Sequence, residues 1–449
     1  MNRDGTFSED ARQLVHIAMG AFALALPYLA WWQAVALACL AVLFNLFVLQ
    51  SLLGRRLFRP GERIGRLGSG IVLYPVSVLG MLLLFRHRLD IVAAAWGALA
   101  VGDGMATIVG RRLPIAAIPW NRAKSVGGSL AFAILGSAAA VGLTWWCREL
   151  AVPPAPPWFF IVAPILAAVA AAAVETIPVS LDDNVSVSIT AVSVMWIVSL
   201  ISEDLLSETV RSLGPTVIVA AAANAAVAVA GYLARTVTIS GMLTGFLLGT
   251  VIFVATGAEG WILLLVCFAS AVVTSRIGLA RKHALGIAEE KGGRRGGGNA
   301  FANTGVAAIA AILVLLSYAH TQAAIAFVAA LVAGASDTVA SEIGKAFGKR
   351  TFLVTTLRMV RPGTPGAMSL EGTVAGIAAA AALSAVASAL GLMPVAFVIP
   401  VTLAATAGAL VESALGATLE PRGVLNNDLL NFINTAVAAF AAIGLSGLA

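Results

Sequence analysis

The sequence predicts an all-α integral membrane protein whose chain crosses the bilayer many times. Of its 449 residues, 60% are hydrophobic and 11% are charged, and the mean hydropathy is +0.95. A soluble protein carries about 25% charged residues, so this composition excludes a soluble domain of this length. The Lys and Arg residues gather in short loops between apolar runs, which is typical of polytopic membrane proteins.

Apolar runs of about 20 residues, the length of a helix that spans a bilayer, recur along the whole chain. We count about fifteen of these segments, joined by short polar stretches. They begin near residues 14, 34, 70, 91, 126, 158, 186, 214, 241, 260, 300, 321, 372, 394 and 429.

Four basic loops indicate the orientation of the chain. They are 55–66, 111–124, 276–295 and 345–361, and alternating crossings place all four on the same side as the N-terminus. Because Lys and Arg are retained in the cytoplasm, we expect the N-terminus and the polar motifs to be cytoplasmic, in the bacterial inner membrane. Polar residues 1–13 precede a run long enough to span, so we expect no cleavable signal peptide.

The net charge of +6 belongs to these loops, where it favours lipid headgroups and phosphates rather than nucleic acid. The three cysteines, Cys39, Cys147 and Cys267, lie in separate apolar stretches. Their scattered positions predict neither a disulfide framework nor a metal site.

One arrangement of polar residues occurs twice. Each copy has an Asp at the end of an apolar segment, then basic residues, then a small hydroxyl residue and a glycine that open the next segment. The first copy consists of Asp103, Arg111, Lys124, Ser125 and Gly128. The second consists of Asp337, Lys345, Gly372 and Thr373. Eight segments separate the two Asp residues, so both segments cross in the same direction, and we expect two parallel homologous bundles, 1–205 and 206–449.

Acidic residues in the first half predict a cation site. Asp103, Asp182 and Asp183 fall at expected cytoplasmic ends of segments, and Glu175 lies one or two turns inside its own segment. A carboxylate near the hydrocarbon region is costly unless it is paired or binds an ion. Together with Lys124 and the helix start at Gly128, these acids favour Mg²⁺ and phosphate. The alternative is that Asp103 and Asp182 cap helices or pair with neighbouring Arg residues.

The second half repeats this chemistry with a different set of residues. Its acids are Asp337, Glu342, Glu371, Glu412 and Asp428. Its cations are Lys291, Arg294 and Lys345. The glycine-rich loop 289–299 has the composition of a flexible linker, but Asn299 and Asn303 follow one turn apart as the next segment begins, where amides are expected to face a ligand or a partner.

No other catalytic pattern is evident. His16 follows Arg12 by one turn at the start of its segment, and we expect a lone His at this place to be an interfacial residue rather than a base. The sequence holds no phosphate-binding loop of the Gly-x-x-x-x-Gly-Lys-Ser/Thr type.

Residues 1–205 resemble the phytol and dolichol kinase group, whose relatives include the CDP-diacylglycerol synthases. The resemblance rests on Glu175 and on Arg-Gln-Leu-Val-His-Ile at 12–17, Gly-Glu-Arg at 61–63, Leu-Tyr-Pro-Val-Ser at 73–77, Gly-Asp-Gly-Met-Ala at 102–106, Gly-Arg at 110–111, Pro-Trp-Asn-Arg-Ala-Lys-Ser at 119–125, Gly-Gly-Ser at 127–129 and Leu-Asp-Asp-Asn at 181–184.

Residues 215–449 resemble a second integral membrane family, which includes the plant phytyl-phosphate kinase. The matching stretches are Gly-Ile-Ala-Glu-Glu-Lys-Gly-Gly-Arg-Arg at 286–295, Asn-Ala-Phe-Ala-Asn at 299–303, Ser-Asp-Thr-Val-Ala-Ser-Glu-Ile-Gly-Lys at 336–345, Ser-Leu-Glu-Gly-Thr at 369–373 and Asn-Asn-Asp-Leu-Leu-Asn at 426–431.

These resemblances imply a fusion of two kinases. The first half would transfer a phosphoryl group from CTP to a long-chain isoprenoid alcohol of the phytol or geranylgeraniol type, and the second half would convert the monophosphate to the diphosphate. The implied catalytic residues are Asp103, Asp183, Asp337 and Asp428. The implied Mg²⁺ ligands are Asp103, Glu175, Asp182, Asp183, Asp337, Glu371 and Glu412. The implied phosphate-binding residues are Arg111, Lys124, Ser125, Gly128, Lys291, Arg294, Lys345 and Gly372.

Two other functions fit the same sequence. A cytidylyltransferase that makes a CDP-linked lipid would use a similar metal and triphosphate site. A membrane transporter would suit the repeats and the many segments, although transporters place their polar residues at the membrane midplane, whereas here they cluster at one face.

Overall fold

The computed structural model describes residues 8–49, 69–113, 115–287 and 293–447. Within these ranges it is helical almost throughout, and ten helices are long and apolar enough to cross a membrane. Three shorter apolar helices are also present. The all-α polytopic class is therefore confirmed, while the count of about fifteen crossings is not. The basic loop 55–66 and Lys291 lie outside the described residues.

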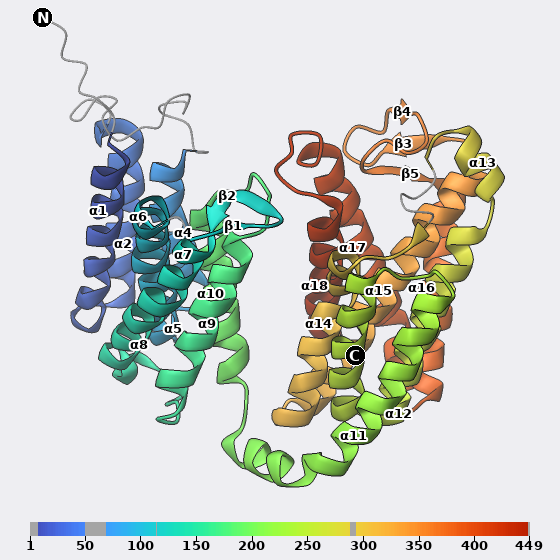
Figure 1. Ribbon diagram of the computed structural model, residues 1–449, viewed down its shortest axis with the longest axis horizontal. Coiled ribbons are helices and arrows are strands. Elements are labelled where there is room, and N and C mark those ends of the chain that lie inside the picture. The colour runs from blue at the N-terminus through green and yellow to red at the C-terminus, as the bar shows by residue number, and fades with distance from the viewer. Residues whose placement is uncertain (1–7, 50–68, 114, 288–292, 448–449) are drawn as a thin grey trace, which may run out of the picture. The chain divides into compact units, whose positions relative to one another are not determined.

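The chain divides into two compact units, Met1–Leu200 and Ile201–Ala449, drawn from blue to green and from green to red in Figure 1. The helices of unit 1 are α1 (Glu9–Met19), η1 (Gly20–Tyr28), α2 (Trp31–Leu43), η2 (Phe44–Val48), α4 (Gly70–Leu84), α5 (Leu89–Gly97), η3 (Ala98–Asp103), α6 (Gly104–Arg112), α7 (Val126–Ala131), η4 (Phe132–Gly136), α8 (Ser137–Trp146), η5 (Arg148–Leu150), α9 (Phe159–Glu175) and α10 (Asp183–Ser199).

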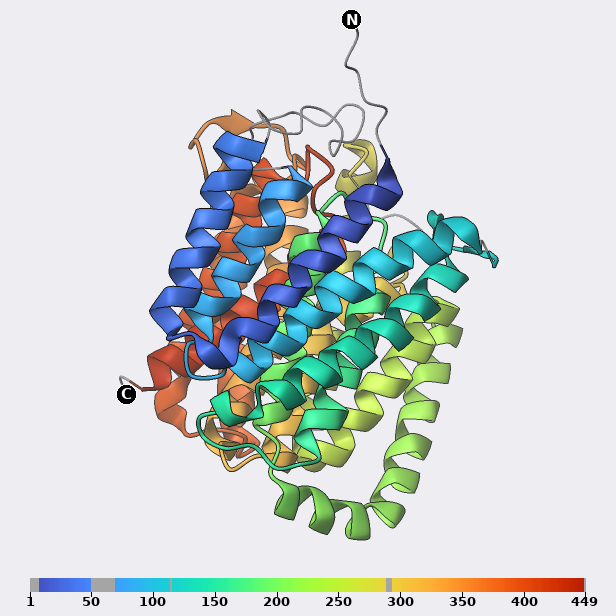
Figure 2. The ribbon, with the colours of Figure 1, turned by 90° about the vertical axis from the view of Figure 1, so that its left-hand side faces the viewer.

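Several of these elements are parts of longer continuous helices, here called rods. The helices α5, η3 and α6 form one apolar helix, Leu89–Arg112, and α7, η4 and α8 form another, Val126–Trp146. Figure 2 shows these rods beside the rod formed by α1 and η1. The strands β1 (Ala117–Ile118) and β2 (Asn121–Ser125) pair antiparallel in the loop between the first two rods. This hairpin leads directly into α7, so its last residues lie beside the end of α6.

The position of Asp103 differs from the prediction. The sequence placed it at the end of an apolar segment, but it lies inside the continuous helix Leu89–Arg112. The six residues up to Asp103 form a single π-helical stretch, η3, a feature that occurs frequently at functional sites. Asp337 likewise lies inside its helix, which continues to Phe347. Hydropathy falls where the polar residues begin, whereas the backbone remains helical because the residues that follow are compatible with a helix.

The helices of unit 2 are α11 (Glu203–Leu233), α12 (Ile239–Arg276), α13 (Leu279–Ala284), α14 (Gly297–Leu316), α15 (His320–Phe347), α16 (Leu370–Ala389), η7 (Val395–Phe397), α17 (Val398–Thr418) and α18 (Asn427–Ser446). A small antiparallel sheet of order β4-β3-β5 joins α15 to α16, with β3 at Thr351–Leu353, β4 at Met359–Val360 and β5 at Ala367–Ser369. The core is centred on α15, whose run from Ile325 to Ser336 is buried throughout.

Two expected features of unit 2 require correction. The boundary expected between residues 205 and 206 lies inside a helix, because α11 begins at Glu203, where Glu203 and Asp204 interact favourably with the positive end of the helix dipole. The segments expected from residues 241 and 260 are two limbs of α12, joined at Gly257, whose φ of 71° and ψ of −166° interrupt the helix. A left-handed φ is accessible to glycine at little cost. Every other expected segment start falls within or next to a helix.

A buried ion pair fastens α13 to α15. The Nζ atom of Lys282 lies 2.5 Å from Oε2 of Glu342 and donates to the carbonyl of Ser275 at 2.8 Å. The side chains of both charged residues are at most 2% exposed. Lys345 donates to Oε1 of the same Glu342 at 2.9 Å. Lys345, predicted to bind phosphate, therefore already has a carboxylate partner.

Removal of one partner of this pair should destabilise unit 2. We expect Glu342→Gln to cost about 3–5 kcal/mol because it leaves Lys282 charged and buried without a counter-charge. The double variant Lys282→Met with Glu342→Leu should recover most of this loss. The measurement is thermal unfolding of the purified protein in detergent. Equal melting temperatures for wild type and Glu342→Gln would show that the pair contributes nothing.

Candidate functional site

A polar cavity of about 830 Å³ opens in unit 1. Its walls come from α1, α6, the β1–β2 hairpin, the start of α7 and the segments at the end of α9 and the start of α10. The cavity contains acidic, basic and hydroxyl side chains beside the glycine-rich crossing of α6 and α7. A cavity of this size accommodates a small polar ligand such as a nucleotide.

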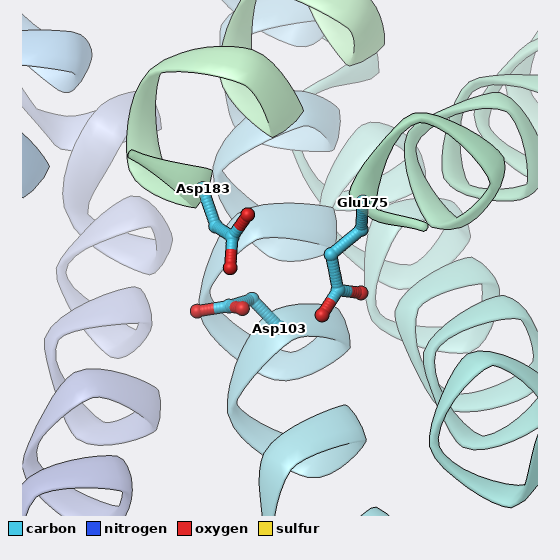
Figure 3. A group of neighbouring side chains, drawn as sticks. All are labelled: Asp103, Glu175 and Asp183. Carbon is cyan, nitrogen blue, oxygen red and sulfur yellow. The ribbon is translucent and has the colours of Figure 1, made fainter. Parts of the chain in front are cut away.

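Three carboxylates meet in this cavity. Asp103 comes from η3, Glu175 from the last residue of α9 and Asp183 from the first residue of α10. One oxygen of each lies within 4.8 Å of the others, and Figure 3 shows the three side chains directed toward a common point. Asp103 is 8% exposed and Glu175 is 5% exposed. Carboxylate oxygens at this spacing fit a hard divalent cation such as Mg²⁺.

Lys124 links two of these acids. Its Nζ atom donates to Oε1 of Glu175 at 2.5 Å and to Oδ2 of Asp183 at 2.9 Å. Burial alone would lower the pKa of Lys124, but the negative charges of Glu175 and Asp183 raise it above its ordinary value. The side chain of Lys124 is still 28% exposed, so this ammonium group stays charged and can reach a ligand in the cavity.

The start of α7, which follows Lys124 in the sequence, lies in close contact with α6. Ser125 is the N-cap of α7, and its Oγ atom accepts from the backbone N–H of Gly128 at 3.1 Å. A Cβ atom on Gly128 would lie 2.8 Å from the carbonyl oxygen of Ala106 and 3.3 Å from Cα of Gly110. Only glycine lets α6 and α7 approach this closely. Ser125 and Gly128 line the cavity, and their hydrogen bond fixes the end of the hairpin that carries Lys124.

Asp182 has a different role from the one implied for it. It is the N-cap of α10, and its Oδ1 atom accepts from the backbone N–H of Asn184 at 3.0 Å and from its Nδ2 atom at 2.7 Å. Asp182 is not one of the three clustered carboxylates. This geometry agrees with the alternative given above, in which Asp182 caps a helix.

Arg111 lies at the rim of the cavity. It donates to Oδ1 of Asp10 at 3.1 Å, and Arg112 donates to Oδ2 of the same Asp10 at 3.0 Å. The Arg111 side chain is 57% exposed, and it lines the cavity. An exposed pair of this kind is held weakly, so an anionic ligand could replace Asp10 at Arg111.

His16 belongs to the site although the sequence indicated an interfacial residue. Its Nε2 atom lies 3.5 Å from Oδ2 of Asp103 and 3.1 Å from the carbonyl oxygen of Leu99, and its ring contacts the ring of Tyr74. The available signal was its spacing from Arg12, because residues four apart share a face of a helix and both line the cavity.

Unit 2 contains a second group of polar side chains in its interior. Asp337 of α15 and Glu412 of α17 interact, and Asn434 of α18 lies beside Glu412. Asn434 is fully buried, and its amide lies against Glu412 without the geometry of a good hydrogen bond. Ionisable side chains inside a membrane protein are rare and are a feature of functional sites. Asn434 was not identified from the sequence, although it follows Asn431 by one turn.

The other predicted residues of unit 2 lie in separate places. Oε1 of Glu371 accepts from the backbone N–H of Lys349 at 3.3 Å. The carboxylate of Asp428 lies next to Gly298, at the start of α14. The guanidinium group of Arg294 lies over the ring of Tyr232 at 5.8 Å.

The helix crossing of unit 1 has a counterpart in unit 2. The Oγ atom of Ser369, the N-cap of α16, accepts from the backbone N–H of Gly372 at 3.1 Å. A Cβ atom on Gly372 would lie 2.5 Å from the carbonyl oxygen of Ala340 and 3.1 Å from Cα of Gly344. The residue that precedes this serine is Met368, where unit 1 has Lys124.

Comparison with known proteins identifies relatives of this chain. The model of the family described as integral membrane protein DUF92 matches residues 222–439. An uncharacterized membrane protein of Synechocystis is 41% identical over 45% of this chain and 80% of its own length. The chloroplastic protein VTE6 of Arabidopsis thaliana is 35% identical over 52% of this chain and 73% of its own length.

A further relative is the chloroplastic farnesol kinase of Arabidopsis thaliana, which is 30% identical over 40% of this chain. This chain spans 62% of the length of the farnesol kinase. No solved structure matches.

The raised pKa of Lys124 gives a prediction for stability against pH. In a metal chelator, we expect Lys124→Met to lower the melting temperature by several degrees, because Glu175 and Asp183 lose their counter-charge. A lysine whose pKa is raised on folding contributes its stability below the ordinary pKa of about 10.4 and loses it only as the pH rises through the raised value. The difference from wild type should therefore still be present at about pH 10.

Thermal scans of wild type, Lys124→Met and the exposed control Lys349→Met check this. A difference that already disappears between about pH 7 and pH 9 would show that Lys124 does not carry the charge inferred for it.

Proposed function

The chain belongs to the DUF92 family of integral membrane proteins, and we propose on this premise that it is a kinase that phosphorylates the hydroxyl group of an isoprenoid alcohol. The proposal rests on one observation. Asp103, Glu175 and Asp183 bring three carboxylates together beside Lys124 in a polar cavity. The similarity to a protein named farnesol kinase supports an isoprenoid alcohol as the phosphoryl acceptor.

Phosphoryl transfer requires alignment and neutralisation of charge more than covalent chemistry by the protein. Asp103, Glu175 and Asp183 would hold a Mg²⁺ ion, which supplies positive charge to the phosphate oxygens. Lys124 neutralises the transferred phosphoryl group as a mobile ammonium charge. At the rim of the cavity, Arg111 would release Asp10 and bind the triphosphate instead.

Transfer of the phosphoryl group also requires one group that accepts the hydroxyl proton of the alcohol. The hydroxyl oxygen of the alcohol forms a bond to the γ-phosphorus while the bond from that phosphorus to the nucleoside diphosphate breaks. The hydroxyl proton passes to the carboxylate of Asp183, the most exposed of the three acids, whose side chain is 39% exposed. Asp103 is positioned by His16, which lies against its Oδ2 atom.

The donor nucleotide in this proposal is CTP, as the resemblance to the phytol and dolichol kinase group implies. The acceptor is a long-chain alcohol of the phytol or geranylgeraniol type. The cavities face the cytoplasm, in the inner membrane of a bacterium, where the nucleotide is available.

Unit 2 catalyses the second phosphorylation in this proposal, from the monophosphate to the diphosphate. Its helix crossing at Ser369 and Gly372 repeats the contacts of Ser125 and Gly128 in unit 1, which supports two copies of one fold. Asp337 and Glu412 take the acidic roles. Lys345 is held by Glu342, so its part is to position α13 and α15 rather than to bind phosphate.

A cytidylyltransferase is the second candidate, because a metal and triphosphate site would serve it equally well. The products distinguish it from a kinase. Purified protein with labelled CTP and phytol should yield phytyl phosphate and CDP, whereas a cytidylyltransferase releases pyrophosphate. A transporter yields neither product.

The two halves can be separated by single substitutions. We expect Asp103→Asn to lower formation of the monophosphate by about 10²–10³-fold or more, because the charge on the metal and phosphates is no longer balanced. Asp337→Asn should leave the first step intact and cause monophosphate to accumulate. Thin-layer chromatography of labelled lipid products measures both. The exposed variant Asp204→Asn serves as the control, and full diphosphate synthesis by both site variants would refute the assignment.

The carboxylate cluster should bind a divalent cation directly. We expect Mn²⁺, a spectroscopic substitute for Mg²⁺, to bind the wild type, and Asp103→Asn to weaken this binding at least tenfold because one anionic ligand becomes a neutral amide. Electron paramagnetic resonance of free Mn²⁺ during a titration gives the affinity. Asp204→Asn should bind as the wild type does, and unchanged binding by Asp103→Asn would place the cation elsewhere.

A further inference from the structure

Unit 2 contains a second cavity, of about 140 Å³, between α11, α12, α14 and α15. Most of its wall is apolar and includes Leu248, Leu264, Phe268 and Leu331. A buried cavity of about 150 Å³ lined by apolar side chains accepts a six-carbon hydrocarbon such as benzene. This cavity therefore has room for about one isoprene unit, which has five carbons.

One end of the cavity is polar. Arg295, Asn299 and Asn303 line it there, at the start of α14. Arg295 is anchored to the start of α12 by its backbone, which donates to the carbonyl of Thr236 at 3.0 Å and accepts from the N–H of Thr238 at 3.0 Å. The Oδ1 atom of Asn299 is buried and has no hydrogen-bond partner. A buried amide in this state indicates a ligand at this position, and rotation of the Asn299 amide would present its NH₂ group, which donates, to an anionic head group.

Asn224 lies at the opposite end of the cavity, and both atoms of its side-chain amide have hydrogen-bond partners. The Nδ2 atom of Asn224 donates to the carbonyl of Ala220 at 2.9 Å, and its Oδ1 atom accepts from Nε1 of Trp261 at 3.0 Å. The cavity thus changes from an end lined by Arg295, Asn299 and Asn303 to an apolar end where the amide of Asn224 is satisfied. An amphiphile with a polar head and a hydrocarbon chain matches this gradient.

A glycine-lined face of α12 keeps the cavity open. Gly241, Gly245 and Gly249 are four residues apart, so they share one side of the helix. A Cβ atom on Gly241 would overlap the carbonyl oxygen of Arg295, and one on Gly249 would overlap Oδ1 of Asn224. A Cβ atom on Gly245 would meet nothing within 4 Å. The space above Gly245 is therefore unfilled by protein.

The polar end also adjoins the acidic group of unit 2. Gly334 lines the cavity, and a Cβ atom there would lie 3.0 Å from Oδ1 of Asn303. Asp337 follows Gly334 by three positions on α15 and so lies on the same side of the helix, one turn further on. A head group at Asn303 would accordingly lie next to the carboxylates that the proposed second phosphorylation uses.

We propose that this cavity binds the isoprenyl chain of an isoprenyl monophosphate, with the phosphate at Arg295 and Asn299 and the hydrocarbon above Gly245. The proposal rests on the proposed function of unit 2, for which it identifies the substrate site. Because the cavity holds only part of a long chain, the first isoprene unit next to the phosphate lies inside and the remainder extends between α11 and α14 toward the lipid.

The test is photolabelling of the full-length protein, without nucleotide, by geranylgeranyl monophosphate that carries a diazirine in its first isoprene unit. We expect labelled residues on α12 and α14 at the cavity wall. Gly245→Leu should reduce labelling at least tenfold, because its side chain fills the space without meeting backbone. Gly245→Ala, which adds one methyl group, should have a smaller effect.

The matched control is Gly444→Leu on α18, where a Cβ atom also meets nothing within 4 Å and which does not line the cavity; it should label as the wild type does. Labels on other surfaces, equal labelling of the Gly245→Leu and Gly444→Leu variants, or complete competition by a bilayer phospholipid would overturn the proposal. If Gly245→Leu does not fold, the position of the labels in the wild type still decides.

Failure of the proposed kinase activity would look different. In that case labels appear at the cavity wall but no phosphorylated product forms when CTP is added. Diphosphate synthesis without labels in the cavity would instead keep the kinase and remove this site.

Discussion

The meeting of three carboxylates, two of them buried, beside one ammonium group is the constraint on which unit 1 depends. Each buried charge carries a desolvation cost that only a well-placed partner offsets. Lys124 reaches Glu175 and Asp183 but leaves the third acid, Asp103, with only His16 at 3.5 Å. Three carboxylates against one ammonium charge leave the cluster negative. In the proposed function, this cluster would take a cation, and the positive groups at the rim would take the anion that accompanies the cation.

Placement of Lys124 requires the local structure around it. Lys124 lies on β2 of the hairpin, and the hydrogen bond between Ser125 and Gly128 ends the hairpin at the start of α7. The glycine contact between α6 and α7 fixes the position of the hairpin relative to α6. Unit 2 has the same crossing at Ser369 and Gly372, with Met368 in place of the lysine. Its acids meet the amide of Asn434 instead. The shared scaffold therefore supports two different electrostatic environments, which suits two substrates of different charge.

The sequence was sufficient for the class of fold and for the acids of unit 1, because hydropathy and motif spacing are local properties. Asp103, Glu175 and Asp183 were named from the sequence and meet in the structure. The failures concern contacts between distant segments. Nothing near Lys345 or Glu342 in the sequence identifies Lys282, sixty residues away, as the buried partner. His16 looked isolated because its neighbour Asp103 lies in another helix. Hydropathy also locates the lipid boundary rather than the last helical residue, which misplaced Asp103 and Asp337 at segment ends.

The depth of Asp103 has a consequence for how two unlike substrates could meet. Its helix continues for nine residues to Arg112, so with a rise of about 1.5 Å per residue the carboxylate lies about 14 Å along the helix from that end. A triphosphate is too strongly hydrated to enter hydrocarbon, whereas a long-chain alcohol cannot leave it. In the proposed reaction, the polar cavity would bring the soluble donor inward to Asp103, while the apolar alcohol would need only to present its hydroxyl group. A reaction centre inside the helix, rather than at its end, is what the proposed pair of a lipid acceptor and a soluble donor would require.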